Sequence, residues 1–213
     1  QQPTAAALAV GVSIAVKWMS LPLLGFMAWR GGKGHTWQWP RPLFLLATGI
    51  LPLALAVVPF CEGLRCPIVP FDSPFINYGR SAALIPQLVG GWLPTSIQAN
   101  WIYGLPLGLL VLLGLTRNGS IWQFLERYLI ALMLLSPIIH AWYFTWLTPF
   151  AVASRNWGTR LVSVSAFIYF ALPYRLALGA DGWQLDVWQR WVLWLPFVVG
   201  VAWSATGEVT RSR

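Results

Sequence analysis

The stretch SPIIHAWYFTWLTPF, residues Ser136–Phe150, places one histidine among large aromatic side chains and between two prolines. An imidazole titrates near about pH 6.5 and can accept, donate or relay a proton, so His140 is the residue here whose type could do chemistry. Three interpretations are open: a catalytic or binding group, a packed ring with satisfied polar atoms, or a marker of where a helix leaves a membrane. No Ser-His-Asp arrangement, phosphate-binding loop or dinucleotide motif accompanies it, and no second ligand lies at metal spacing.

Two cations are also placed where they could meet an anion. Lys17 lies near the middle of the apolar run AVGVSIAVKWMSLPLLGFMAW. A lysine at the centre of a membrane helix costs about 2.5–3.5 kcal/mol, so it either snorkels, pairs with a neighbouring helix, or holds an anion such as a lipid-linked phosphate. Arg80 lies in PFINYGRSAALIPQLVGGWLP, which predicts a short amphipathic helix at the surface. That helix is either a lid over the bundle or a substrate-facing element in which Arg80 binds a phosphate.

The two cysteines, Cys61 and Cys66, lie five residues apart in CEGLRC. They are too few for a structural zinc site. We expect them to form a disulfide in a loop on the extracytoplasmic side of a membrane, where oxidising conditions favour one.

The composition indicates what kind of secondary structure carries these residues. The chain has 213 residues, of which 57% are hydrophobic and 9% charged, and its mean hydropathy is +0.63. Soluble domains carry about a quarter charged residues, and a chain of this length cannot bury so many apolar side chains in one core. Apolar runs recur along the whole length, which indicates a polytopic membrane protein. The formal charge of +8 comes from short loops, so we expect no nucleic-acid partner.

We therefore predict an all-α transmembrane helical bundle, a single domain over residues 1–213, with about seven spans. The predicted spans are 5–29, 42–60, 97–115, 121–139, 141–154, 161–178 and 189–205. The fifth is short and interrupted by Pro149, so six spans plus one re-entrant segment is an alternative. Residues 61–95 form the predicted extracytoplasmic loop, which carries the short amphipathic helix.

Connections rich in lysine and arginine alternate along the chain with connections of balanced charge, and this alternation predicts the orientation in the membrane. The basic connections, expected in the cytoplasm, hold Arg30, Lys33, Arg41, Arg117, Arg155, Arg160, Arg211 and Arg213. The connections with balanced charge hold Glu62, Arg65, Asp72, Arg80, Arg175, Asp181, Asp186 and Arg190. This predicts an integral protein of a bacterial inner membrane or a thylakoid-type membrane, with the N-terminus outside and the C-terminus in the cytoplasm. Many of the 15 tryptophans lie near predicted span ends, as in an interfacial aromatic belt.

Two stretches resemble a known family. AVGVSIAVKWMSLPLLGFMAWRGG resembles a segment of GT-C-type membrane glycosyltransferases, of the polyprenyl-phosphate-mannose-dependent mannosyltransferase-like branch. LLSPIIHAWYFTWLTPF is similar to that branch's helix start of the kind S-P-x-x-H-P-W-Y-x-x-W-x-x-P. The matching positions are Ser136, Pro137, His140, Trp142, Tyr143, Trp146 and Pro149, while Ala141 stands where proline is common. The resemblance covers most of the chain, but only the C-terminal half of such an enzyme.

The resemblance implies transfer of a sugar from a lipid-phosphate donor to an acceptor on the extracytoplasmic face. His140 would then act in catalysis by contacting the donor phosphate or sugar. Lys17 and Arg80 would bind the phosphate, and Trp142 and Tyr143 would line the pocket.

Family enzymes use an acidic residue of their first outer loop as the base, and that loop would precede Gln1. Asp72, Asp181 and Asp186 do not replace it. We therefore expect a C-terminal part of a longer membrane protein, active as a hexosyltransferase only with the part that supplies the carboxylate.

The alternative is a non-catalytic integral subunit of a larger membrane complex, with other membrane subunits as partners. A transporter is a third and weaker interpretation, because no inverted repeat is visible. We expect membrane lipids and a polyprenyl-phosphate sugar as partners and no resident cofactor or metal site; whether a divalent metal takes part is left open.

Overall fold

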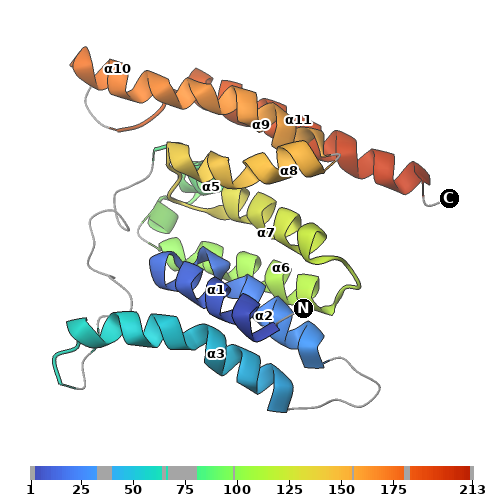
Figure 1. The fold of residues 1–213 in the computed structure, drawn as a ribbon. Helices are drawn as coiled ribbons and strands as arrows, with labels where there is room; N and C mark the ends of the chain where they lie inside the picture. Colours follow the sequence, from blue (N-terminus) through green and yellow to red (C-terminus); the bar gives the residue numbers. More distant parts are fainter. Residues whose placement is uncertain are drawn as a thin grey trace. The chain divides into compact units, whose positions relative to one another are not determined.

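The computed structural model describes residues 3–32, 40–63, 66, 81–97, 99–154, 156–179 and 183–211. These ranges are helical and contain no strand, so the all-α prediction is confirmed (Figure 1). The chain forms two compact units, and each is described by itself. Unit 1 comprises Gln1–Phe71 and Val111–Leu125; unit 2 comprises Asp72–Leu110 and Glu126–Arg213.

Unit 1 contains α1 (Pro3–Val16), the short 3₁₀ helix η1 (Trp18–Ser20), α2 (Leu21–Gly32), α3 (Pro40–Val57) and η2 (Val58–Phe60). Unit 2 contains α5 (Ile85–Trp92), η3 (Pro94–Ile97), η4 (Asn100–Tyr103), η5 (Ala141–Leu147), α8 (Thr148–Ala153), α9 (Trp157–Ser165), η6 (Ala166–Phe170), α10 (Ala171–Ala177) and α11 (Val187–Arg211). Two helices contribute residues to both units: α6 (Gly104–Thr116) and α7 (Ile121–Leu135).

The first apolar segment is not one continuous helix. Lys17 adopts an extended conformation, with φ −156° and ψ 122°, and separates α1 from η1 and α2. The hydroxyls of Ser13 and Ser20 lie 2.6 Å apart across this break. The Lys17 amide still donates to the Ser13 carbonyl at 2.8 Å, so α1 closes its last turn before the chain turns back. The segment predicted as a single span over 5–29 therefore consists of two helices, with Lys17 to Ser20 forming a turn between them.

The two halves of this segment both pack on α3 as a hairpin. A Cβ at Gly11 would lie 2.2 Å from the Gly49 carbonyl oxygen, and a Cβ at Gly49 would lie 2.4 Å from the Leu24 side chain. Both α1 and α2 therefore contact α3 at the same level, and α2 runs back along the unit (Figure 1). Pro3 and Gly32 consequently lie at one end of unit 1 and Lys17 at the other. The sides of a membrane on which the two ends of the segment lie stay a prediction.

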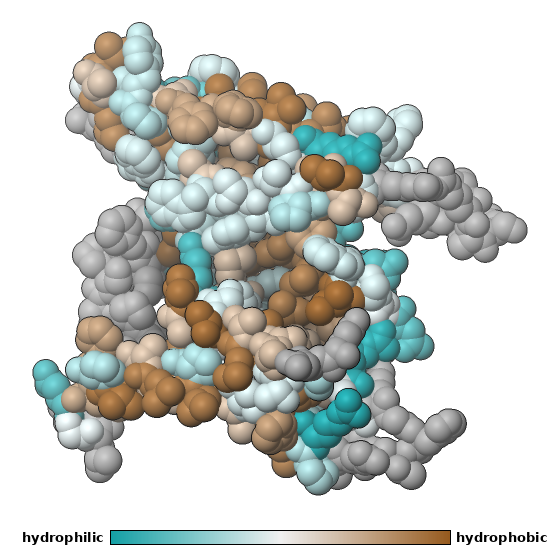
Figure 2. All heavy atoms as spheres, viewed as in Figure 1, coloured by the Kyte–Doolittle hydropathy of each residue, from teal (hydrophilic) through white to brown (hydrophobic). Residues whose placement is uncertain are grey.

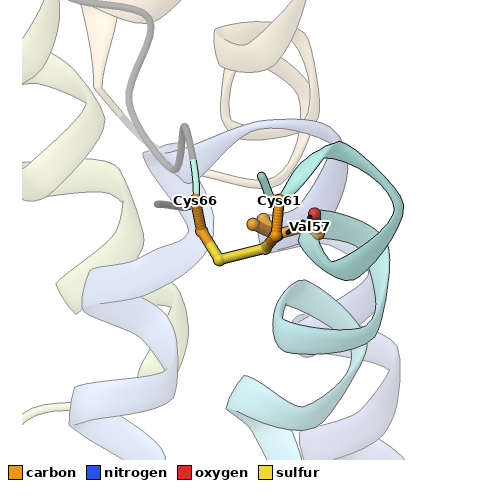
Figure 3. Close-up of a disulfide and its surroundings, with 3 residues drawn as sticks. All are labelled: Val57, Cys61 and Cys66. Atoms are coloured by element: carbon orange, nitrogen blue, oxygen red, sulfur yellow. Dashed lines mark hydrogen bonds between the residues drawn. A yellow bond between two sulfur atoms is a disulfide. The ribbon is translucent and has the colours of Figure 1, made fainter. Parts of the chain in front are cut away.

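The end of α3 carries the predicted disulfide. Cys61 and Cys66 are bonded to one another, and the Cys61 Sγ lies 3.5 Å from the Val57 carbonyl oxygen (Figure 3). The bond closes a small loop directly after η2. Because α1 runs alongside α3 in the same direction, the disulfide and Lys17 share one end of unit 1 (Figure 1).

Within the described residues, one helix is long and apolar enough to cross a membrane, Pro40–Phe60, formed by α3 and η2. Its 21 residues correspond to about 30 Å of helix. Apolar atoms gather along α3 on the face seen in Figure 2. The apolar helix α6 buries none of its residues, so it too presents apolar side chains on its surface.

In unit 2, α9 and α11 pack closely because two glycines meet. A Cβ at Gly200 would lie 2.5 Å from the Gly158 amide nitrogen. The side chain of Asn156 caps α9 by accepting from the Gly158 N–H at 2.9 Å. The core beside this crossing is centred on Trp194 and Phe197, both fully buried, whose rings lie 5.7 Å apart.

The segment predicted as the fifth span is broken. It consists of η5 and α8, which meet at Leu147–Thr148, with Pro149 in the first turn of α8. Seven residues of 3₁₀ helix and six of α-helix measure about 23 Å together, which is less than the roughly 30 Å hydrocarbon core of a bilayer. This length is compatible with the alternative of six spans plus one re-entrant segment at 141–154, and the number of spans stays a prediction.

Candidate functional site

The backbone around His140 is shaped by a turn that ends α7. The Ser136 hydroxyl donates to the Ile138 carbonyl at 2.6 Å, and Pro137 prevents the helix from continuing. The chain is extended at His140, with φ −117° and ψ 158°, and η5 starts at the next residue. The imidazole therefore projects from a junction between two helices and is buried.

Aromatic rings surround this imidazole. The ring of Trp142 stacks on His140 with centroids 4.5 Å apart, and Tyr143 meets it edge-on at 5.5 Å. Tyr143 in turn stacks on Trp146 at 4.4 Å. In a 3₁₀ helix, side chains three residues apart eclipse one another, which explains the last pair. The predicted group of His140, Trp142 and Tyr143 thus lies together, and Trp142 remains 55% exposed.

Two hydroxyls bind the carbonyl that precedes His140. Ser81 Oγ donates to the Ile139 oxygen, and Tyr169 Oη donates to the same oxygen at 3.0 Å. The two hydroxyl oxygens lie 2.5 Å apart. Both side chains are almost completely buried. The turn is therefore tied to the segment after residue 80 and to the helix formed by α9, η6 and α10.

The α10–α11 connection joins the same end of unit 2. The Leu185 N–H donates to the Ser81 carbonyl at 3.0 Å, and Arg175 forms an ion pair with Asp186 at 2.9 Å. The Gln189 side chain accepts from the Asp186 N–H at 2.9 Å, which satisfies a backbone donor at the start of α11. Asp186, one of the carboxylates that the sequence analysis set aside as the base, is thus engaged by Arg175.

The opposite end of unit 2 holds a different polar group. Ser154 Oγ donates to the Glu126 carboxylate at 2.6 Å. The Arg160 guanidinium donates to the carbonyls of Ala151 and Ser154 at 3.2 and 3.0 Å. The side chain of Ser204 accepts from the Trp157 N–H at 2.8 Å. Since α7 runs from Glu126 toward the His140 turn, its length separates the two groups.

The other predicted site residues lie elsewhere. Lys17 is half-buried at the break in unit 1, whereas His140, Trp142 and Tyr143 belong to unit 2. Arg80, with Asp72 and Asp181, lies outside the described residues. Among the residues that the structure describes, no three His, Cys, Asp or Glu side chains gather as metal ligands would.

Sequence reasoning missed the residues that hold the His140 turn in place. Ser81, Tyr169 and Trp194 bind it or its neighbours over separations of 30 residues or more, and no local pattern indicates such contacts. The exception is Gln189, because Asp186 followed three residues later by glutamine is a capping-box pattern that the sequence displays.

The chain was compared with known families, curated proteins and solved structures. No family model, no curated protein and no solved structure shows significant similarity to it. Functional assignment therefore rests on the residues and on their geometry.

Proposed function

We propose that the chain is the membrane-embedded part of a GT-C-type glycosyltransferase. It would move a sugar, mannose-like in kind, from a polyprenyl-phosphate donor to an extracytoplasmic acceptor. The observation that carries the proposal is the buried imidazole of His140, which lies at a helix junction among Trp142 and Tyr143. The carbonyl before it is fixed by Ser81 and Tyr169. A fixed donor next to aromatic surfaces suits a lipid-linked sugar phosphate, because preorganised donors cost no reorganisation during reaction.

In this mechanism a carboxylate supplied by another part of the protein removes the proton of the acceptor hydroxyl. The resulting oxygen attacks the anomeric carbon, the bond from that carbon to the phosphate oxygen breaks, and the lipid phosphate leaves with the bonding electrons. His140 donates a hydrogen bond to a phosphate oxygen and stabilises the charge that develops there. Trp142, whose ring is half-exposed, offers a surface to the sugar.

The contacts within each unit support the sidedness predicted for the connections of that unit. In unit 2, Ser81, the His140 turn and the Arg175–Asp186 pair share one end, and all three segments were assigned to the extracytoplasmic side. In unit 1, Arg30 donates to the Gly119 carbonyl, and both of these connections were assigned to the cytoplasm. With the hairpin in place, Pro3 joins the cytoplasmic end, and α1 and α2 form a re-entrant pair with Lys17 at its tip.

A non-catalytic subunit of a larger complex is the second candidate. It is favoured by α6, an apolar helix of 13 residues with no buried residue. Such a surface fits a neighbouring membrane helix as well as lipid.

The test is sugar transfer by the complete protein in proteoliposomes supplied with a panel of radiolabelled polyprenyl-phosphate sugars. We expect transfer from one donor by the wild type. We expect His140→Ala to reduce transfer by about 100-fold, because one oriented donor to a developing charge contributes on that scale.

The matched control is Trp203→Ala, which removes a 71% exposed ring from α11 in the same unit and should leave transfer unchanged. Unchanged transfer in His140→Ala would remove His140 from the mechanism. Absence of transfer from every donor, with the wild type folded in the membrane, would favour the subunit.

A further inference from the structure

The carbonyl of Ile139 accepts hydrogen bonds from two distant parts of the chain. Ser81 and Tyr169, the donors, are 58 and 30 residues away from Ile139. Ser81, Ile139 and Tyr169 are each at most 3% exposed. Water therefore has little access to replace these hydrogen bonds, and a buried polar array of this kind is costly to break.

This carbonyl belongs to the peptide bond between Ile139 and His140. Because a peptide unit is planar, its oxygen, its nitrogen and the flanking Cα atoms lie close to one plane. Fixing the oxygen from two directions fixes that plane, and with it the Cα of His140 from which the imidazole projects. The extended conformation of His140 thus depends on side chains outside its own segment.

The two hydroxyls are themselves held in place. The Ser81 carbonyl accepts from the Leu185 N–H at 3.0 Å, and the Ala82 carbonyl accepts from the Trp194 indole N–H at 2.7 Å. Tyr169 Oη lies 2.5 Å from Ser81 Oγ, so each hydroxyl also positions the other. The array therefore joins the segment after residue 80 to the helix of Tyr169, to the α10–α11 connection at Leu185 and to α11 at Trp194.

We propose that Ser81 and Tyr169 are positioning residues for His140, acting through the Ile139 carbonyl. The inference rests on the proposed function, since it takes His140 as the group that meets the donor. Neither hydroxyl touches the substrate in this account. The two hydroxyls set the orientation of the His140 imidazole. When that orientation is lost, a reaction that depends on an aligned imidazole slows.

The test is the ¹³C NMR signal of the His140 imidazole in ¹³C-histidine-labelled complete protein in lipid nanodiscs, assigned by its loss in His140→Gln. We expect Ser81→Ala and Tyr169→Phe each to shift this signal. The matched controls are Ser163→Ala and Tyr174→Phe. Ser163 donates only within α9, to the Thr159 carbonyl at 2.9 Å, and Tyr174 is 67% exposed.

Two further variants distinguish a changed orientation of His140 from a general loss of protein stability. Ser81→Thr retains the hydroxyl, and we expect it to restore the His140 signal of the wild type. The double variant Ser81→Ala/Tyr169→Phe should shift the signal by less than the sum of the single shifts, because both donors share one acceptor.

If both single variants lower the melting temperature and leave the His140 signal unchanged, the positioning role is wrong. The NMR measurement uses no donor sugar, so it is independent of the proposed function. In the transfer assay we expect each variant to reduce the rate by up to about 100-fold. A shifted signal with unchanged transfer would show that the direction of the imidazole does not limit the rate of transfer, and it would leave the structural coupling to His140 in place.

Discussion

Trp194 connects the core of unit 2 to the segment that reaches the His140 turn. Its ring is fully buried, packs 5.8 Å from Phe144 and donates its indole proton to the Ala82 carbonyl at 2.7 Å. Ala82 is itself buried, so this carbonyl depends on a protein donor. The residue therefore combines a packing role with a hydrogen bond that aligns Ser81.

Trp194→Phe keeps an aromatic ring and removes that donor. We expect the free energy of unfolding to fall by about 1–3 kcal/mol, because a buried carbonyl loses its hydrogen bond. Urea unfolding in detergent micelles, followed by fluorescence, measures the loss. Trp203→Phe on the exposed side of the same helix should change it by less than about 0.5 kcal/mol. Equal losses in the two variants would show that the hydrogen bond contributes nothing.

For single residues, the sequence predicts which side chains could take part in chemistry better than it predicts which side chains hold them in place. The aromatic neighbours of His140 lie within three residues of it, so their grouping follows from local geometry. Ser81 and Tyr169 are ordinary polar residues of apolar segments, and their meeting at one carbonyl depends on the packing of the whole unit. Long-range hydrogen bonds of this kind have no local sequence pattern.

Glycines set how closely the helices of unit 2 approach. A Cβ at Gly158 would lie 2.3 Å from the Val201 side chain and 2.8 Å from the Phe197 carbonyl oxygen. No such neighbour lies within 4 Å of the Cβ position at Gly108 in α6. The two positions therefore separate the effect of close packing from the effect of helix propensity.

Gly158→Ala should lower the free energy of unfolding by about 1–3 kcal/mol, because α9 and α11 must move apart. Gly108→Ala should raise it by about 0.5–1 kcal/mol, because alanine favours a helix interior more than glycine does. Thermal unfolding of both variants in detergent gives the comparison. A stabilising effect of Gly158→Ala would contradict the close approach of α9 and α11.

The hairpin of α1 and α2 makes a prediction about sidedness. Both native cysteines form the disulfide, so an introduced cysteine is the reactive thiol within this chain. Ala5→Cys and Arg41→Cys should react with an impermeant maleimide from the same side of sealed vesicles. Trp18→Cys should not react from that side, because it lies beyond the turn. If Ala5→Cys and Arg41→Cys are labelled from opposite sides, residues 5–29 cross the membrane once and the hairpin is contradicted.

The positions of the helices can be predicted from the apolar runs of the sequence. The break at Lys17 cannot be predicted from them. The predicted segment at 42–60 corresponds to α3 and η2, and Asn156 is a recognisable N-cap. At Lys17 a continuous helix and a turn are both compatible with the local sequence. The choice depends on packing of α1 and α2 against α3 at Gly49, which no local pattern specifies.

The described helices of both units expose many large apolar side chains. Large apolar side chains are exposed on α3, α6 and α11, and charged groups gather at helix ends. Such a surface is stable against lipid or another apolar partner. Composition alone predicts this property, because it depends on residue counts and not on which helices meet.

We propose that the His140 turn contacts a polyprenyl-phosphate donor. The most direct measurement is photocrosslinking of the complete protein in nanodiscs with a polyprenyl phosphate that carries a diazirine next to the phosphate, followed by peptide mapping. We predict adducts within 136–147 that unlabelled polyprenyl phosphate displaces and that His140→Ala reduces. Adducts confined to the exposed faces of α3 and α6, and not displaced by the unlabelled lipid, would contradict the account.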